Sequence, residues 1–241
     1  MKRLLSATAL IISMGWMSSA QALFIDTFND VTDSPYQFVT DTTSLTSLNT
    51  GLSGVLGGER LLELSDIGGS ITAVPGDSNA SLVVNTDISE ISLSNDTGVS
   101  SKGKISWNGL DQNGLGGVDL TESLVNSVFL LDITSADTDV EMIFSVTDTV
   151  GNTATSSLTS GEGFLQFTFA EFIQATSNGD NETDFTSANF LSLTLIGPES
   201  SDVAFTFVQS TTPPPVPEPA SALIMGLGLI GLGLSRRVKK N

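Results

Sequence analysis

Between positions 24 and 207 apolar residues alternate with polar ones, and no stretch keeps an apolar period of 3.6 residues. Because successive side chains of an extended strand point to opposite faces, this period of two predicts strands with one buried face. The predicted strands cover residues 24–28, 60–64, 81–84, 91–93, 105–107, 129–133, 140–146, 154–158, 165–169, 191–195 and 203–207. A turn at 150–153 makes a hairpin of two of them. Many short strands with turns between them predict an all-β fold, an antiparallel β-sandwich of jelly-roll type.

The phenylalanines of the later strands fall on the same alternating faces as the aliphatic residues. Aromatic side chains bury large apolar areas, so we expect these stripes to form the core of the sandwich and not a ligand platform. The segment Glu171 to Ile173 directly follows a predicted strand, and we expect a short helical or irregular crossover there.

The amino-terminal segment has the order of a secretory signal peptide. Lys2 and Arg3 precede an apolar stretch from Leu4 to Trp16, and Ala20-Gln21-Ala22 matches the small-x-small pattern of a cleavage site. We therefore predict a signal peptide at 1–22, cut after Ala22 by signal peptidase, with Leu23 as the mature amino-terminus.

The carboxy-terminal segment has a different order. After a predicted ectodomain at 23–210, a proline-rich linker at 211–215 leads to Pro217-Glu218-Pro219 and an apolar run from Ala220 to Leu234. Four basic residues lie near the carboxy-terminus: Arg236, Arg237, Lys239 and Lys240. Segment 216–241 resembles the PEP-CTERM sorting signal. The resemblance implies export in a Gram-negative bacterium and an inner-membrane intermediate that exosortase processes. The protein would then reach the envelope surface or an extracellular matrix of exopolysaccharide and biofilm.

The length of the apolar run agrees with that resemblance. A transmembrane helix at about 220–235 rises about 1.5 Å per residue and spans less than the roughly 30 Å hydrocarbon core, so it inserts marginally. The basic end favours a cytoplasmic carboxy-terminus, with the ectodomain outside. Gly226, Gly228 and Gly231 fit the GxGxxG spacing of dinucleotide-binding proteins. However, no strand precedes these glycines and only ten residues follow them, so we reject a dinucleotide-binding site here.

Composition excludes several functions. The chain has no Cys and no His, which removes thiol catalysis, imidazole bases and Cys or His metal sites. Of its 27 acidic residues only Glu218 lies outside the ectodomain, whereas the ectodomain holds just three basic residues, Arg60, Lys102 and Lys104. Such a negative field repels nucleic acid, and a solvated acidic surface is its simplest meaning.

A metal ion bound here would be a hard cation held by oxygen. Asp180, Glu182 and Asp184 alternate in one polar loop, so an extended backbone would turn all three carboxylates to one side as a Ca²⁺ site. A second trio, Asp137, Asp139 and Glu141, has the same spacing. Both trios lack the glycine that an EF-hand loop requires. The alternative to a Ca²⁺ site is that these acidic side chains are simply solvated in their loops. Apart from Ca²⁺, no cofactor is expected.

Two further ectodomain residues stand out. Arg60 lies between Glu59 and Glu63, and we expect a structural ion pair, with a bound anion as the alternative. Trp107, the only ectodomain tryptophan, follows two lysines and precedes Asn108; it is a candidate carbohydrate contact or a half-buried aromatic residue at a strand end.

These observations favour an exported cell-surface or extracellular-matrix protein with a non-catalytic structural or adhesive sandwich. A carbohydrate-binding module that contacts extracellular polysaccharide is the alternative, suggested by Trp107 and Tyr36. A glycoside hydrolase that uses two carboxylates is a third reading, because that chemistry needs neither His nor Cys.

Overall fold

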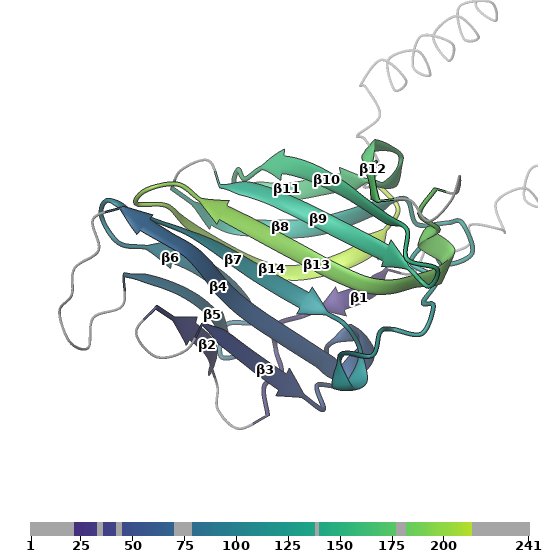
Figure 1. Ribbon diagram of the computed structural model, residues 1–241, viewed down its shortest axis with the longest axis horizontal. Helices are drawn as coiled ribbons and strands as arrows, with labels where there is room; N and C mark the ends of the chain where they lie inside the picture. The colour runs from purple at the N-terminus through teal and green to yellow at the C-terminus, as the bar shows by residue number, and fades with distance from the viewer. Residues whose placement is uncertain are drawn as a thin grey trace, which may run out of the picture.

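Two antiparallel sheets pack face to face in the computed structural model, which describes residues 22–32, 36–41, 45–69, 79–137, 140–176 and 182–213 (Figure 1). The sandwich predicted from the alternation is thus confirmed. The predicted signal peptide up to residue 21 and the tail from residue 214 lie outside the described residues. Within the described ranges, no helix is long and apolar enough to cross a membrane.

Sheet A has the strand order β11-β8-β14-β6-β5-β2, and β1 pairs with β14 as well. Its strands are β11 (Gly163–Thr168), β8 (Val128–Ala136), β14 (Asp202–Thr211), β6 (Glu90–Asn95), β5 (Ala80–Asn85), β2 (Tyr36–Thr40) and β1 (Leu23–Asp26). Leu23 lies opposite Ser210 in the pairing of β1 with β14. The first and last strands therefore bring both ends of the domain to the same place.

Sheet B has the order β12-β10-β9-β13-β7-β4-β3 and is the layer nearer the viewer in Figure 1. Its strands are β12 (Ile173–Thr176), β10 (Thr153–Thr159), β9 (Glu141–Asp148), β13 (Ala188–Gly197), β7 (Val99–Trp107), β4 (Glu59–Gly69) and β3 (Thr46–Thr50). Strands β9 and β10 form the predicted hairpin. Short 3-10 turns lie at η2 (Leu56–Gly58), η3 (Leu110–Gln112), η4 (Phe169–Glu171) and η5 (Phe185–Ser187).

The core lies between the sheets and consists of the inward residues of both. Phe129 of β8 stacks on Phe144 of β9 with ring centroids 4.1 Å apart, and the ring centroid of Phe167 lies 5.7 Å from that of Phe144. Phe205 of β14 is also fully buried and meets Phe28 edge-on. Burying one such side chain contributes about 1.5–3 kcal/mol. Most of these aromatic residues are core residues, as their alternation predicts. Phe207 is the exception: β14 shifts register between Phe205 and Val208, so Phe207 is only half-buried and packs against the exposed Phe24.

Some local predictions differ from the structure. β1 ends at Asp26, because Phe28 takes a left-handed backbone with φ of 51° while its ring stays buried. β11 ends at Thr168, and Phe169 begins η4, so the expected crossover at 171–173 is this 3-10 turn followed by β12. The strands β2, β3 and β12 lie at sheet edges and were not predicted.

Candidate functional site

Trp107 ends β7 with its side chain fully buried. Its ring packs 6.2 Å from that of Phe144, and Ile105 lies on the same inward face of the strand. A tryptophan that stacks on a sugar must offer an exposed ring face. The prediction of a carbohydrate contact at Trp107 is therefore wrong, and the residue belongs to the core.

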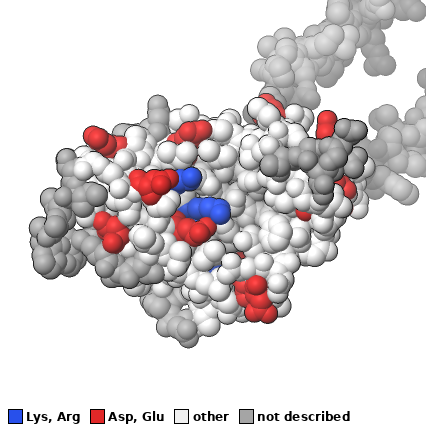
Figure 2. Space-filling view, viewed as in Figure 1, with Lys and Arg blue, Asp and Glu red and all other residues white. Residues whose placement is uncertain are grey.

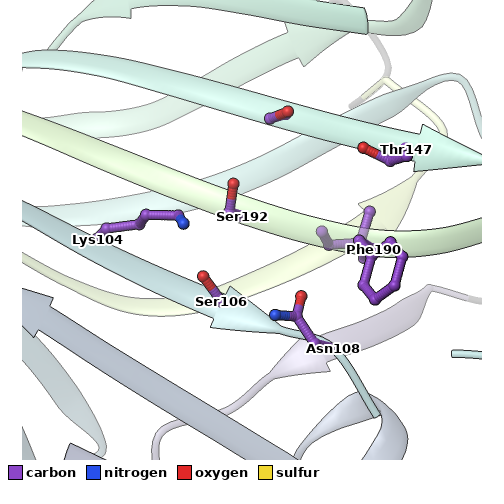
Figure 3. A pocket seen from close by; sticks show the side chains of 8 residues that line it. Lys104, Ser106, Asn108, Thr147, Phe190 and Ser192 are labelled. Carbon is purple, nitrogen blue, oxygen red and sulfur yellow. The ribbon is translucent and has the colours of Figure 1, made fainter. Parts of the chain in front are cut away.

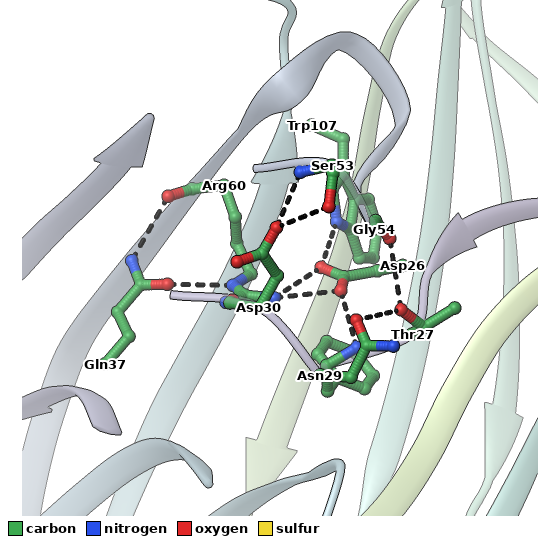
Figure 4. Close-up of polar contacts among 10 residues, drawn as sticks. Asp26, Thr27, Asn29, Asp30, Gln37, Ser53, Gly54, Arg60 and Trp107 are labelled. Carbon is green, nitrogen blue, oxygen red and sulfur yellow. Dashed lines mark hydrogen bonds and ion pairs between the residues drawn. The ribbon is translucent and has the colours of Figure 1, made fainter. Parts of the chain in front are cut away.

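The indole of Trp107 completes a buried polar cluster (Figure 4). The Nη1 of Arg60 donates to both carboxylate oxygens of Asp26, at 2.8 and 3.0 Å. Trp107 Nε1 donates to Asp26 Oδ2 at 2.8 Å, and the backbone N–H of Phe28 donates to Oδ1 at 2.9 Å. Gln37 Oε1 accepts from Arg60 Nε at 2.8 Å. The cluster thus joins β1 and β2 of sheet A to β4 and β7 of sheet B.

The expected ion pair of Arg60 exists, but its partner is Asp26 and not the neighbouring glutamates. Glu63 instead pairs with Lys104 at 3.2 Å. Burial raises the pKa of the Asp26 carboxyl above its ordinary value, although Arg60 and the hydrogen bonds from Trp107 and Phe28 act against that rise. A fully buried carboxylate that accepts four hydrogen bonds from three donor groups has no free lone pair for a substrate, so the cluster is structural.

The two calcium candidates are only partly described. Asp180 and Asp139 lie outside the described residues. Asp184 Oδ1 accepts from the backbone N–H of Thr186 at 2.9 Å and caps η5, and Glu182 is exposed. Among the described residues no three acidic side chains gather closely enough to hold a metal ion. The Ca²⁺ site stays a prediction.

The residues predicted for sorting and processing lie at the two ends. Pro217, Glu218, Pro219 and the basic residues after Leu234 are outside the described residues, as is Ala20. Ala22 is the first residue that the structure describes, directly before β1. A cut after Ala22 would leave the whole of β1 in the mature protein.

A shallow depression of about 240 Å³ lies on the outer face of sheet B (Figure 3). We call it the hydroxyl groove; its lining residues are Lys104, Ser106, Asn108, Ser145, Thr147, Phe190, Leu191 and Ser192. Strand pairing explains the lining: Ser192 of β13 lies opposite Ser145 of β9 on one side and opposite Ser106 of β7 on the other. These three serine side chains form one cross-strand row, and because they are short the surface is depressed there.

Ser106 is the most unusual residue of the groove. Its side chain is only 2% exposed, and its Oγ has no hydrogen-bond partner among the described residues. A buried hydroxyl without a partner costs about 1–3 kcal/mol, so such groups are rare unless something else satisfies them. That Oγ is itself buried, so a ligand in the groove reaches it only when neighbouring side chains shift.

Charged side chains are sparse on this face of the acidic domain. Figure 2 shows mostly uncharged surface with a central group of acidic and basic side chains. Lys102 lies 3.9 Å from Asp66, and Lys104 lies 3.2 Å from Glu63. Both ectodomain lysines thus lie on the outer face of sheet B, where acidic neighbours neutralise them. An uncharged polar ligand would meet little electrostatic opposition here.

A second depression, of about 530 Å³, lies at the end of the sandwich where β14 finishes. We call it the end pocket; its aromatic wall is Phe169, Phe172 and Phe185, with Leu124, Ala170, Gln174, Glu182 and Asp184 among the other lining residues. The rings of Phe169 and Phe185 are stacked 4.7 Å apart, and Phe172 meets Phe185 edge-on at 5.2 Å. This pocket combines an apolar wall with an acidic rim.

Both depressions were missed in the sequence. The hydroxyl residues of the groove occupy the outward positions of β9 and β13, where Ser145, Thr147 and Ser192 alternate with apolar residues. That alternation shows that these hydroxyls face outward. Which strands lie side by side depends on the topology of the whole sheet, so the row could not be predicted from single strands.

The carboxy-terminus matches a known motif. The sequence model of the PEP-CTERM protein-sorting motif matches residues 215–237, so the chain carries this motif, as its sequence predicts. The motif indicates export and sorting to the cell surface in Gram-negative bacteria. Among curated proteins, none is significantly similar to this chain.

Several solved structures are similar to this chain at low TM-scores and low identity. A family 11 carbohydrate-binding module of a cellulosomal cellulase of Clostridium thermocellum has a TM-score of 0.42 at 11% identity, over 83% of this chain and 100% of that module. A family 30 carbohydrate-binding module of another cellulosomal cellulase of that organism has a TM-score of 0.35 at 11% identity, over 80% and 97%. An exo-beta-agarase has a TM-score of 0.40 at 12% identity, over 82% of this chain and 26% of its own.

Proposed function

We propose that this chain is an exported protein whose tail exosortase processes, and whose sandwich then serves as a non-catalytic structural or adhesive module at the cell surface or in the extracellular matrix. The observation that carries the proposal is the sorting motif at 215–237, which begins shortly after β14 ends at Thr211. All described strands thus precede the motif. The sandwich can fold outside the membrane while the tail remains a substrate for processing.

The test replaces Pro217, Glu218 and Pro219 with alanine in a host that carries the sorting protease. Alanines also favour backward extension of the apolar helix, which would hide the extended backbone that a protease grips. We expect the variant to be exported but to accumulate in the membrane at the size of the uncut precursor. Membrane fractionation and intact mass measure this.

The chain offers a matched control for that experiment. Pro198 and Glu199 form a Pro-Glu pair in the turn between β13 and β14. Alanines at these two positions should leave processing unchanged. If the tail variant is cut and delivered as the wild type is, the tail is only an anchor and the proposal fails.

We also propose that the sandwich is not an enzyme. A general acid needs a raised pKa and must reach the bond that it protonates. Among the described acids whose pKa shift is resolved, only Asp26 has a raised pKa, and it is enclosed by Arg60 and Trp107. Incubation of the purified protein with extracellular polysaccharides should release no new reducing ends.

Binding of a neutral polysaccharide is a second candidate function, favoured by the hydroxyl groove. Sugar hydroxyls donate and accept hydrogen bonds, as do the half-buried side chains of Ser192 and Asn108. The Oγ of Ser106 is unpartnered but buried, so it joins them only when its neighbours shift. We expect Ser106→Ala with Ser192→Ala to weaken glycan binding about tenfold, since each lost hydrogen bond is worth about 0.5–1.5 kcal/mol.

A control separates binding from folding in that test. Ser106→Ala removes an unpartnered hydroxyl, so it should leave the free energy of unfolding unchanged or raise it. Ser92→Ala with Ser94→Ala alters the same chemistry on β6 of sheet A and should leave binding unchanged. A glycan array and isothermal titration measure binding. Equal affinities for all variants would remove the groove from consideration.

A further inference from the structure

The end pocket lies beside the point where the chain leaves the sandwich. The backbone O of Thr211, the last residue of β14, accepts from the N–H of Ser127 at 3.0 Å, and the O of Ser127 accepts from the N–H of Phe169 at 2.9 Å. Asn126 Nδ2 donates to the O of Ser210 at 3.1 Å. Phe169 belongs to the aromatic wall of the pocket, so the tail starts next to that wall.

The turn that carries Leu124 adds a second apolar surface. Glu122, Ser123 and Leu124 all have left-handed backbones, with φ of 46°, 63° and 68°. Asp119 and Thr121 hold this turn, because Asp119 Oδ2 accepts from the Ser123 N–H and Thr121 Oγ1 accepts from the Leu124 N–H, each at 2.9 Å. The strained turn leaves the Leu124 side chain 81% exposed at the pocket.

The tail that begins here has the chemistry of a ligand for an aromatic groove. Its sequence from Thr212 is Thr-Pro-Pro-Pro-Val-Pro. Proline-rich segments form a preorganised extended helix, so they lose little entropy on docking and bind grooves lined with aromatic side chains. At about 3.1 Å per residue, residues 213–217 in such a helix would reach about 15 Å.

We propose that residues 213–217 of this chain dock in the end pocket, against Phe169, Phe172, Phe185 and Leu124. Glu182 and Asp184 give the rim of the pocket a negative charge, which disfavours Glu218 inside it. Docking therefore ends at Pro217. Pro-Glu-Pro is then held in extended backbone at a fixed distance from the sandwich. This docking goes beyond the proposed sorting function and does not require it.

A cysteine pair tests the contact in the full-length precursor, kept in detergent. The chain has no native cysteine, so an engineered pair gives one defined disulfide. Ala170→Cys places a thiol at the pocket on an exposed, small residue, and Val216→Cys places one in the tail. Under mild oxidation we expect an intramolecular disulfide, detected by intact mass.

Two controls separate docking from mere tethering. Thr159→Cys with Val216→Cys puts the first thiol at the far end of β10, away from Ala154, which lines the pocket. The second control keeps the Ala170→Cys and Val216→Cys pair and replaces residues 213–215 with Gly-Ser-Gly. This change keeps the number of residues between the sandwich and the second thiol but removes three prolines. Leu124→Asp adds a charge to the wall.

Docking predicts that the Gly-Ser-Gly and Leu124→Asp changes each slow disulfide formation about tenfold, towards the rate of the Thr159 control. An unchanged rate in the Gly-Ser-Gly variant would show that the tether alone brings the thiols together, and would overturn the proposal. A disulfide between two copies would assign the pocket to a second chain and overturn it as well. Because the rate is measured without exosortase, the result does not depend on the sorting proposal.

Discussion

Trp107 Nε1 donates a hydrogen bond of 2.8 Å to Oδ2 of Asp26, although the two residues are 81 positions apart. Both side chains are fully buried, and Arg60 donates to the same carboxylate. Asp26 is the last residue of β1 in sheet A, whereas Trp107 and Arg60 belong to strands of sheet B. One carboxylate therefore ties the first strand of the sandwich to the opposite sheet.

Trp107→Phe should test how much that hydrogen bond contributes to the free energy of unfolding, because it removes the donor and keeps an aromatic ring. The loss leaves Asp26 short of one partner in the core, which costs about 1–3 kcal/mol in the free energy of unfolding. Urea unfolding followed by far-UV circular dichroism measures it. Ile105→Val, on the same inward face, is the control for lost volume and should cost about 0.5–1.5 kcal/mol. A Trp107→Phe variant as stable as the wild type would contradict the prediction.

Arg60→Met should be more damaging, because it leaves the carboxylate of Asp26 buried without its counter-charge. Breaking a buried ion pair from one side costs about 3–5 kcal/mol. Adding Asp26→Leu to that variant should recover part of the loss, since it removes the uncompensated charge. Recovery is incomplete because the Trp107 indole N–H and the Phe28 N–H lose their acceptor. Chemical denaturation of the single and double variants distinguishes the cases. Equal stability of the two variants would show that the ion pair is not the source of the cost.

The alternation in the sequence predicted the buried strands well, because inward residues such as Leu193 and Phe144 recur at every second position. It missed β2, β3 and β12, whose apolar residues are largely turned to solvent: Phe38 is 51% exposed and Ile173 75% exposed. A strand at a sheet edge buries too little to leave a clear pattern.

The candidate sites were harder to predict. Trp107 is two positions from Ile105, so the alternation puts both side chains on the same, inward face of the strand. The polar residues next to Trp107 suggested an exposed side chain instead. The partnership of Arg60 with Asp26, 34 positions away, depends on how the sheets pack. The hydroxyl groove depends on strand order in the same way. Local sequence contains neither relationship.

Leu124→Gly should raise the free energy of unfolding or leave it unchanged, although it removes an apolar side chain. Leu124 has φ of 68°, and a left-handed backbone costs a residue with a side chain about 1–2 kcal/mol that glycine avoids. Its side chain is exposed, so little burial is lost within the sandwich. Thermal unfolding measures the effect. The more mobile unfolded chain of the glycine variant offsets part of the gain. A loss above about 1 kcal/mol would show that Leu124 supports the fold itself.

Asp148 should make the protein sensitive to acid through the β9–β10 hairpin. Its Oδ1 accepts from the N–H groups of Val150 and Asn152, at 3.0 and 2.9 Å, and its Oδ2 accepts from Asn152 Nδ2 at 2.8 Å and from the N–H of Asp184 at 3.2 Å. Burial acts to raise the pKa of Asp148, but these hydrogen bonds outweigh it and hold the pKa below its ordinary value.

A folded-state pKa below the unfolded value means that the stabilisation is complete above about pH 4, the unfolded value, and is lost as the pH falls through the folded pKa. Asp148→Asn, which lacks the charge at every pH, should therefore be less stable than the wild type by about 1–3 kcal/mol at pH 7 and approach it as the pH falls below 4. Asp87→Asn, in an exposed turn between β5 and β6, is the matched control and should follow the wild type throughout. Urea unfolding of all three proteins across pH 2.5–7 measures the differences, and a gap between Asp148→Asn and wild type that stays constant with pH would show that the carboxylate charge contributes nothing to the hairpin.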